Sequence, residues 1–328
     1  MCMAVGDYYS SNDGSSSDGF LALRWNGKTW TREQAPVTGQ AGLTRVAVSC
    51  PTARRCVAVT AFDAMVWNGA KWTIQSGLTG SAVSCPSSGF CVAVGSPGDN
   101  DDPIAELLQD GTWTSEDMPR PSAPTSVQNV TLSGVSCASE HFCMAVGSYV
   151  YGTGALPSAS RRVLTLAEVW NGQDWQIMPP VDPTTLASLE AVSCPSPRFC
   201  VAVGTQHTQF TLVEQWTGRN WHVQASPNLS SVGYSTLDSV ACPSTHLCEA
   251  MGTYTGGRYV GTLITESQRS GRWSLEHIPS THSILGRPTL SCPAVDKCVA
   301  VGTTGTRPYS ATWNGRTWIA RKTPNPLQ

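Results

Sequence analysis

The chain has 328 residues, of which 13% are charged and 40% are hydrophobic, and its formal net charge is −2. A surface with so little charge and no basic stripe argues against binding to the phosphate backbone of nucleic acids. No run of residues has the length and apolarity of a transmembrane helix, and helical periodicity is not evident anywhere. The composition therefore favours an all-β chain that binds neither nucleic acid nor the membrane interior.

A short unit recurs along the whole chain. It contains Cys-Pro-Ser-x-x-x-Cys-Val-Ala-Val-Gly and, further on, Trp-Asn-Gly-x-x-Trp. The thirteen cysteines give six pairs with five intervening residues, and Cys2 matches the second member of a seventh pair. The pairs are Cys50–Cys56, Cys85–Cys91, Cys137–Cys143, Cys194–Cys200, Cys242–Cys248 and Cys292–Cys298. A period of this kind predicts a repeat architecture, and we expect about seven units.

Each unit is predicted to contain four short strands, A to D. Strand A ends at the first cysteine, strand B starts at the second, strand C leads into Asn-Gly and strand D follows it. In the first unit, Asn-Gly predicts a two-residue type I′ turn that pairs Trp25 with Lys28 and Leu23 with Trp30. This register places Leu23, Trp25 and Trp30 on one bulky face of the sheet.

Strand A has small residues one and three positions before its cysteine, for example Ser193 and Ala191 before Cys194, so one face of this strand is thin. A bulky face stacked on the thin face of the next sheet fills a radial core, so we predict a seven-bladed β-propeller of four-stranded antiparallel blades. Another all-β repeat array is the alternative. We expect one domain over 1–328, with blades at 1–42, 43–79, 80–129, 130–185, 186–233, 234–283 and 284–328.

The chain begins within a strand B, so the first blade is expected to lack its innermost strand. Regular cysteine pairs favour disulfides and an oxidising compartment over zinc sites, whose ligand spacings are usually shorter. We therefore expect a secreted or cell-surface protein, although this chain shows no signal peptide. It would be a clipped product or a fragment, and Cys2 would have no partner. A monomer is expected, with a dimer linked by Cys2 or by strand donation as the alternative.

In such blades the A–B and C–D turns share one end, and the B–C and D–A connections share the other, which we call the BC/DA face. The B–C connections vary in length, and all eight tyrosines lie in B–C or D–A connections. Variable loops on a rigid scaffold often carry function, and tyrosine suits contact with sugars or proteins. The predicted ligand-binding residues are Tyr149, Tyr151, Arg161, Arg162, Tyr254, Arg258 and Tyr259.

Two carboxylates are the candidates for catalysis. Glu190 and Asp238 each lie four residues before the first cysteine of neighbouring units, which would place both at the mouth of a central channel as acid and base. No cofactor is expected. Asp99, Asp101 and Asp102 are weak candidates for a Ca²⁺ site, because their spacing matches no calcium loop.

The repeat resembles those of secreted bacterial β-propeller proteins, and the likeness spans nearly the whole chain. The endings Gly27-Lys28-Thr29-Trp30 and Gly315-Arg316-Thr317-Trp318 are also similar to the end of the Asp-box hairpin of sialidase-type propellers. The Ser and Asp that open that box are absent here, and the arginine triad, tyrosine and carboxylates of a sialidase site have no matching positions. The resemblance therefore implies the fold and not the activity.

These observations predict an extracellular propeller that binds a glycan or a protein on its BC/DA face and is not an enzyme. A secreted glycan-cleaving enzyme that uses Glu190 and Asp238, either a glycosidase or a lyase, is the first alternative. A purely structural module of the cell surface is the second alternative.

Overall fold

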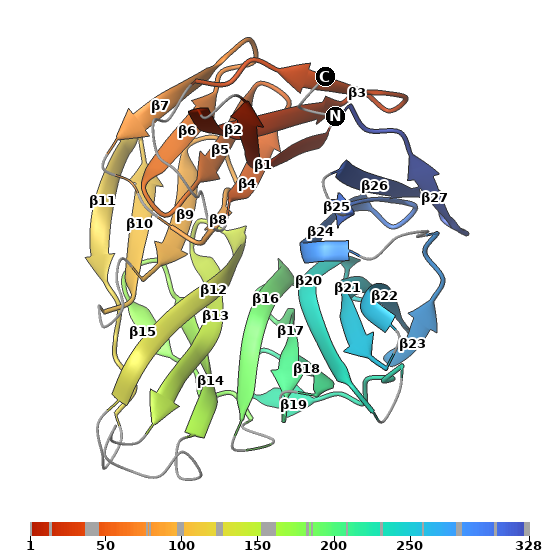
Figure 1. The fold of residues 1–328 in the computed structure, drawn as a ribbon. Coiled ribbons are helices and arrows are strands. Elements are labelled where there is room, and N and C mark those ends of the chain that lie inside the picture. The colour runs from red at the N-terminus through yellow and green to blue at the C-terminus, as the bar shows by residue number, and fades with distance from the viewer. Residues whose placement is uncertain are drawn as a thin grey trace. The chain divides into compact units, whose positions relative to one another are not determined.

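A computed structural model describes most of the chain (Figure 1). The described residues are 2–12, 15–36, 46–76, 78, 80–96, 102–122, 127–151, 162–181, 184, 186–207, 209–229, 232–257, 259–279, 284–304 and 307–324. They belong to two compact units, Met1–Met118 with Lys322–Gln328 (unit 1) and Pro119–Arg321 (unit 2).

Unit 1 contains three antiparallel sheets, which we number blades 1 to 3. Blade 1 has only three strands, β1 (Cys2–Asn12), β2 (Ser15–Trp25) and β3 (Trp30–Glu33). Blade 2 consists of β4 (Ala47–Thr52), β5 (Arg55–Val59), β6 (Asp63–Trp67) and β7 (Trp72–Ser76). Blade 3 consists of β8 (Ala82–Ser84), β9 (Phe90–Gly95), β10 (Ile104–Gln109) and β11 (Thr112–Asp117).

Unit 2 contains four sheets of four strands, blades 4 to 7. Blade 4 consists of β12 (Val127–Ser139), β13 (Phe142–Tyr151), β14 (Arg162–Trp170) and β15 (Trp175–Ile177). Blade 5 consists of β16 (Ala187–Ser196), β17 (Phe199–Gln206), β18 (Phe210–Trp216) and β19 (Trp221–Val223). Blade 6 consists of β20 (Tyr234–Ser244), β21 (Leu247–Gly256), β22 (Tyr259–Arg269) and β23 (Arg272–Glu276), and blade 7 of β24 (Ile284–Ala294), β25 (Lys297–Thr304), β26 (Arg307–Trp313) and β27 (Trp318–Arg321).

Strands that follow one another in the chain are neighbours in every blade, so each blade is an antiparallel meander. The predicted fold class, a seven-bladed β-propeller with a three-stranded first blade, is confirmed. Cys2 lies opposite Trp25, as Cys56 lies opposite Trp67 in blade 2. Cys2 therefore occupies the position of a second cysteine, as the repeat predicted. The six predicted disulfides are all present.

The predicted register of the Asn-Gly turn is wrong. Trp25 pairs with Trp30 and Leu23 with Arg32, so the loop has four residues instead of two. The side-chain oxygen of Asn26 accepts hydrogen bonds from the backbone N–H groups of Lys28 and Thr29, which widens the turn while Gly27 takes a φ of 99°. The two tryptophans still share one face, with ring centroids 5.4 Å apart.

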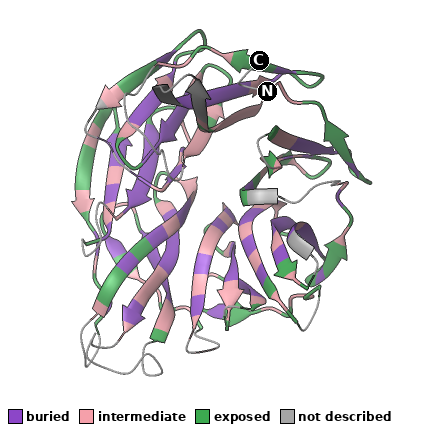
Figure 2. Cartoon of the chain, viewed as in Figure 1, coloured by how far each residue is buried: buried purple, intermediate pink, exposed green. Residues whose placement is uncertain are grey.

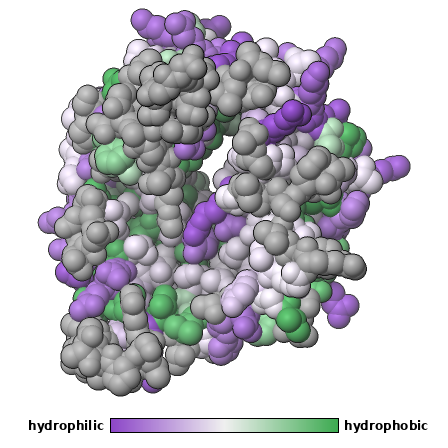
Figure 3. All heavy atoms as spheres, in the orientation of Figure 1, coloured by the Kyte–Doolittle hydropathy of each residue, from purple (hydrophilic) through white to green (hydrophobic). Residues whose placement is uncertain are grey.

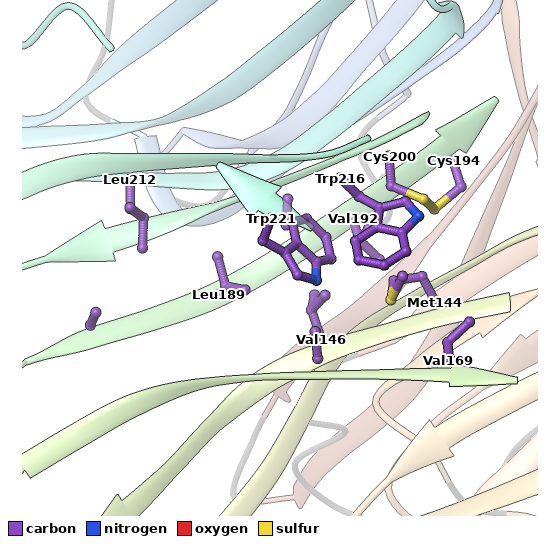
Figure 4. Packing of buried hydrophobic residues seen from close by; sticks show 13 residues of the cluster. Met144, Val146, Val169, Leu189, Val192, Cys194, Cys200, Leu212, Trp216 and Trp221 are labelled. Carbon is purple, nitrogen blue, oxygen red and sulfur yellow. A yellow bond between two sulfur atoms is a disulfide. The ribbon is translucent and has the colours of Figure 1, made fainter. Parts of the chain in front are cut away.

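Within each unit the core lies between consecutive blades, as the alternation of bulky and thin faces predicted. Trp216 and Trp221 of blade 5 pack with Val192 of their own blade and against Met144 and Val146 of blade 4 (Figure 4). Buried residues accordingly concentrate on the second and third strands of the four-stranded blades, whereas the fourth strands are more exposed (Figure 2). Among the described residues, no helix has the length and apolarity needed to cross a lipid bilayer.

Candidate functional site

The β13–β14 hairpin of blade 4 brings together three described residues of the predicted contact set, Tyr149, Tyr151 and Arg162. Tyr151 lies directly opposite Arg162, and Tyr149 lies opposite Leu164. Paired residues point to the same side of a sheet, so both tyrosines share one face with Arg162. Both tyrosine side chains are half-buried and Arg162 is exposed. An aromatic ring and a guanidinium therefore meet at the BC/DA end of this hairpin.

Tyr254 has a different environment from the one we expected. Its side chain is 5% exposed, and its hydroxyl donates a 2.6 Å hydrogen bond to the carbonyl oxygen of Val232. The hydroxyl of Tyr309 in blade 7 likewise donates a 2.5 Å hydrogen bond to the carbonyl oxygen of Pro279, and burial raises the pKa of Tyr309 to about 12. These two tyrosines therefore hold D–A connections in place. Arg161 and Arg258 lie outside the described residues, as does the side chain of Tyr259.

Of the three candidate Ca²⁺ ligands, Asp99 and Asp101 lie outside the described residues, and Asp102 is exposed. Within the described ranges, no group of three or more His, Cys, Asp or Glu side chains is arranged to hold a metal ion.

Glu190 and Asp238 both lie at β-bulges of the first strands in unit 2. The pairing skips Glu190 between Leu189 and Ala191 and skips Asp238 between Leu237 and Ser239. Each bulge faces the glycine that ends Cys-x-Ala-x-Gly on the second strand. A Cβ atom on Gly204 would lie only 1.9 Å from the carbonyl oxygen of Ser188, so the repeated glycine is what allows the bulge.

The first strands β12, β16, β20 and β24 lie side by side in unit 2 (Figure 1), and we call this side its inner edge. Here Arg287 of β24 forms an ion pair with Glu190, which lies two blades away on β16. Ser188 also donates to Glu190 at 3.1 Å, and Thr236 donates to Asp238 at 3.5 Å. Glu190, Asp238 and Arg287 therefore form one cluster across blades 5 to 7.

The electrostatics of this cluster differ between its two carboxylates. Burial raises the pKa of Asp238 to about 6, and the charge of Glu190 adds to this effect while Arg287 opposes it. The Oδ2 atom of Asp238 is buried and has no hydrogen-bond partner. Burial acts to lower the pKa of Arg287, but Glu190 and Asp238 outweigh it and raise the pKa overall. One carboxylate is thus paired with a cation and the other is able to hold a proton near neutral pH.

The sequence did not identify Arg287. The repeat aligns Pro288 with Glu190 and Asp238, but the bulge of β24 is longer and extends from Leu285 to Thr289. This longer bulge brings the residue before Pro288 to the cluster. The signal was the Gly286-Arg287-Pro288 sequence, because glycine and proline inside a strand mark irregular pairing.

Sequence reasoning also missed a row of buried glutamates on the third strands. Glu168, Glu214 and Glu266 each lie two residues before the tryptophan position and opposite a small alanine of the second strand. Glu214 accepts a hydrogen bond from the N–H of Val181, and Glu266 accepts one from Ser226 at 2.8 Å. Glu214 and Glu266 therefore fasten D–A connections, which form part of the BC/DA face, whereas both carboxylate oxygens of Glu168 are buried without a hydrogen-bond partner.

On the face shown in Figure 3, the coloured hydrophobic atoms form small separate patches among hydrophilic ones. Among the residues that the structure describes, the large hydrophobic side chains with the most exposure are Val232 at 71%, Tyr234 at 59% and Val295 at 54%. Val232 lies in the connection between blades 5 and 6 and Tyr234 is the first residue of β20, whereas Val295 lies in an A–B turn.

No protein-family model matches the sequence, and no curated protein is similar to it. Among solved structures, the SapL1 lectin in complex with alpha methyl fucoside has a TM-score of 0.53 and 12% identity, over 87% of this chain and 97% of that chain. YCF48 from Cyanidioschyzon merolae has a TM-score of 0.53 and 12% identity, over 88% of each chain. Aleuria aurantia lectin in complex with alpha-methyl-L-fucoside has a TM-score of 0.47 and 12% identity, over 98% of this chain and 96% of that chain. At this identity, the likeness shows the fold alone.

Proposed function

We propose that this chain is an extracellular binding propeller that recognises a glycan on the BC/DA face of unit 2. The observation that carries the proposal is the cross-strand pair of Tyr151 and Arg162. A tyrosine ring stacks on the C–H face of a sugar, and a guanidinium donates several hydrogen bonds to hydroxyl or carboxylate oxygens. Placed opposite each other on neighbouring strands, the two groups suit a ring with an apolar face and a polar edge.

The disulfides support the proposed location. Six of them lie in a chain of 328 residues, one in each blade from blade 2 to blade 7. Disulfides persist in oxidising compartments, where glycans are also displayed. A glycan ligand outside the cell is therefore consistent with the redox chemistry of the chain.

A glycan array probed with the oxidised protein tests the proposal. We expect binding to at least one glycan, weakened about tenfold or more in Tyr151→Ala and in Arg162→Ala. Arg316→Ala is the matched control, because Arg316 is also exposed but lies in a C–D turn at the opposite end of its blade. Silence on every glycan, or equal loss in the control, would contradict the proposal and direct attention to a protein ligand.

A second candidate function is glycan cleavage at the inner edge. It is supported by the contrast between Glu190, which is paired with Arg287, and Asp238, whose pKa is raised to about 6. An ionised carboxylate beside a protonated one is the pattern that glycosidases use. Product analysis of every glycan that binds tests this function. Turnover that disappears in Asp238→Asn, with binding retained, would support cleavage, and bound glycan recovered intact would exclude it for that ligand.

A further inference from the structure

Three large hydrophobic side chains are exposed within six residues of sequence, in the connection between blades 5 and 6 and at the start of β20. Leu229 is 46% exposed, Val232 is 71% exposed and Tyr234 is 59% exposed. The connection belongs to the BC/DA face, because it joins β19 to β20. We call the side chains of Leu229, Val232 and Tyr234 the Tyr234 platform. Exposed apolar residues that are grouped in this way often mark a binding site.

Hydrogen bonds fix the approach to the platform. Ser226 donates to the buried carboxylate of Glu266 in blade 6 and contacts the hydroxyl of Thr211 at 2.6 Å. The side-chain oxygen of Asn228 accepts a 2.9 Å hydrogen bond from the backbone N–H of Thr211. The segment just before Leu229 is therefore tied to blade 5 and to blade 6.

The far side of the platform is fixed as well. The hydroxyl of Tyr254 donates to the carbonyl oxygen of Val232, and the N–H of Ser235 donates to the carbonyl oxygen of Gln209 at 2.9 Å. Thr205 donates to the carbonyl oxygen of Ser235 at 3.2 Å. The partners of these bonds are Tyr254 on β21 of blade 6, Thr205 on β17 of blade 5 and Gln209 between β17 and β18. Blades 5 and 6 therefore both hold the backbone at Val232 and Ser235 in place.

Gly233 is the residue that allows this close packing. Its φ of 108° is a conformation that other residues rarely adopt. A Cβ atom there would lie 2.7 Å from the carbonyl oxygen of Thr255 and 2.9 Å from the Cα atom of Gly256. The end of β21 at Thr255 and Gly256 therefore lies directly against the platform backbone at Gly233.

The hydrogen bonds on both sides of the platform matter for binding because they hold its backbone in place before a ligand arrives. Binding usually requires loops and side chains to become ordered, and a preorganised surface avoids most of that loss of entropy. Three exposed side chains offer far less area than a stable protein interface, which needs about 800 Å² on each partner. One sugar ring matches this size, since tyrosine combines a flat apolar ring with a hydroxyl that forms hydrogen bonds.

We infer that the Tyr234 platform is a second sugar-binding site, which stacks the apolar C–H face of a pyranose ring on Tyr234 between Val232 and Leu229. The inference deepens the proposed function, because the ligand class is the same, but it involves none of the residues of the Tyr151–Arg162 pair. Two sites on one face of unit 2 would bind a branched or repeated glycan with higher avidity than either site alone.

Saturation-transfer NMR with methyl β-D-galactoside and methyl α-L-fucoside tests the site. Both are pyranosides with an apolar C–H face, and galactitol serves as the control ligand because it has hydroxyl groups but no ring. We expect signal on the ring C–H protons of at least one pyranoside and none for galactitol. Tyr234→Ala should weaken binding about tenfold or more, whereas Tyr234→Trp should retain it.

Val223→Ser is the matched control variant, because Val223 is a 40% exposed hydrophobic residue on the outer strand β19 of blade 5, outside the platform. Tyr234 is exposed, so its replacement should leave the disulfides and the melting temperature unchanged. Binding that persists in Tyr234→Ala but is lost in Tyr151→Ala would overturn the inference and leave the proposed function standing. The reverse result would support the platform alone, and no signal from any pyranoside would overturn both.

Discussion

The side-chain oxygen of Ser49 in blade 2 accepts a 2.9 Å hydrogen bond from the backbone N–H of Cys85 in blade 3. The bond connects the first strands of adjacent blades at the residue just before the first cysteine. Ser136 makes the same bond to Cys194, and Ser193 makes it to Cys242, both at 2.9 Å. The small face of strand A thus supplies a hydrogen-bond acceptor as well as space.

Blade 6 shows what happens when this serine is missing. Ala241 occupies the position before Cys242, and the hydrogen bond to blade 7 lies two residues earlier on each strand. There the backbone N–H of Leu290 donates to the side-chain oxygen of Ser239 at 3.0 Å. Two residues before Ser193 the strand has Ala191, which has no hydroxyl to replace the serine. Ser193→Ala should therefore lower the free energy of unfolding by about 1 to 3 kcal/mol, because the partly buried N–H group of Cys242 loses its acceptor. Urea denaturation measures the change. Ala241→Ser is the matched control and should be neutral or stabilising, so equal destabilisation by both variants would argue against the hydrogen bond.

Stability should fall as the pH rises from acidic to mildly alkaline values. Burial raises the pKa of Glu168 to about 8, and those of Glu249 and Glu266 to about 7, from a usual value of 4.5. The folded chain therefore keeps protons that the unfolded chain releases. Their contribution to stability is complete below about pH 4.5 and is lost as the pH rises through 7 and 8.

Glu168→Gln isolates one part of this effect. The amide is neutral at every pH, so the variant should be more stable than the parent at pH 8 and similar to it near pH 4. Thermal melts across this range provide the measurement. The control is Asp117→Asn, which removes an exposed carboxylate of β11 and should leave the pH profile unchanged. A parent protein that is most stable at pH 8 would contradict the assignment of Glu168 as a buried acid.

The glycine opposite each bulge should tolerate no side chain. Gly204→Ala would place a Cβ atom 1.9 Å from the carbonyl oxygen of Ser188, so we expect a loss of about 3 kcal/mol or more, or failure to fold. Gly89→Ala is the control, because the nearest atom to its added Cβ would lie 3.9 Å away. Expression yield and melting temperature compare the two. A stable Gly204→Ala protein would show that the bulge of β16 is able to rearrange.

Alkylation of the cysteines directly counts free thiols and disulfides. All thirteen cysteines lie in the described part of the chain, with twelve in disulfides and Cys2 free. Alkylation before reduction should label one cysteine, and alkylation after reduction should label thirteen, as read by mass spectrometry. Labelling of Cys2 should be slow at neutral pH, because burial raises the pKa of its thiol and the thiolate is the reactive form. Rapid labelling would show that Cys2 is not buried in solution.

The sequence by itself determined the repeat, the strand order, the disulfides and the alternation of bulky and thin faces. These features depend on local periodicity and on residue types at fixed spacings, so they are readable without a structure. It was less reliable for the turn after Trp25, where the Asn26 side chain bonds to the backbone and adds two residues to the loop. The Asn-Gly dipeptide alone does not distinguish a two-residue hairpin loop from this four-residue loop.

The tertiary structure alone decided which of the candidate site residues meet. Arg287 and Glu190 are 97 positions apart in sequence, and a bulge that the repeat does not reveal brings them together. Tyr254 and Tyr234 look alike as loop tyrosines, yet one is buried beneath a turn and the other is displayed on it. Burial and long-range pairing depend on how separate blades stack. A local signal such as Gly286-Arg287-Pro288 marks an irregular strand, but it does not say which residues of other blades that strand contacts.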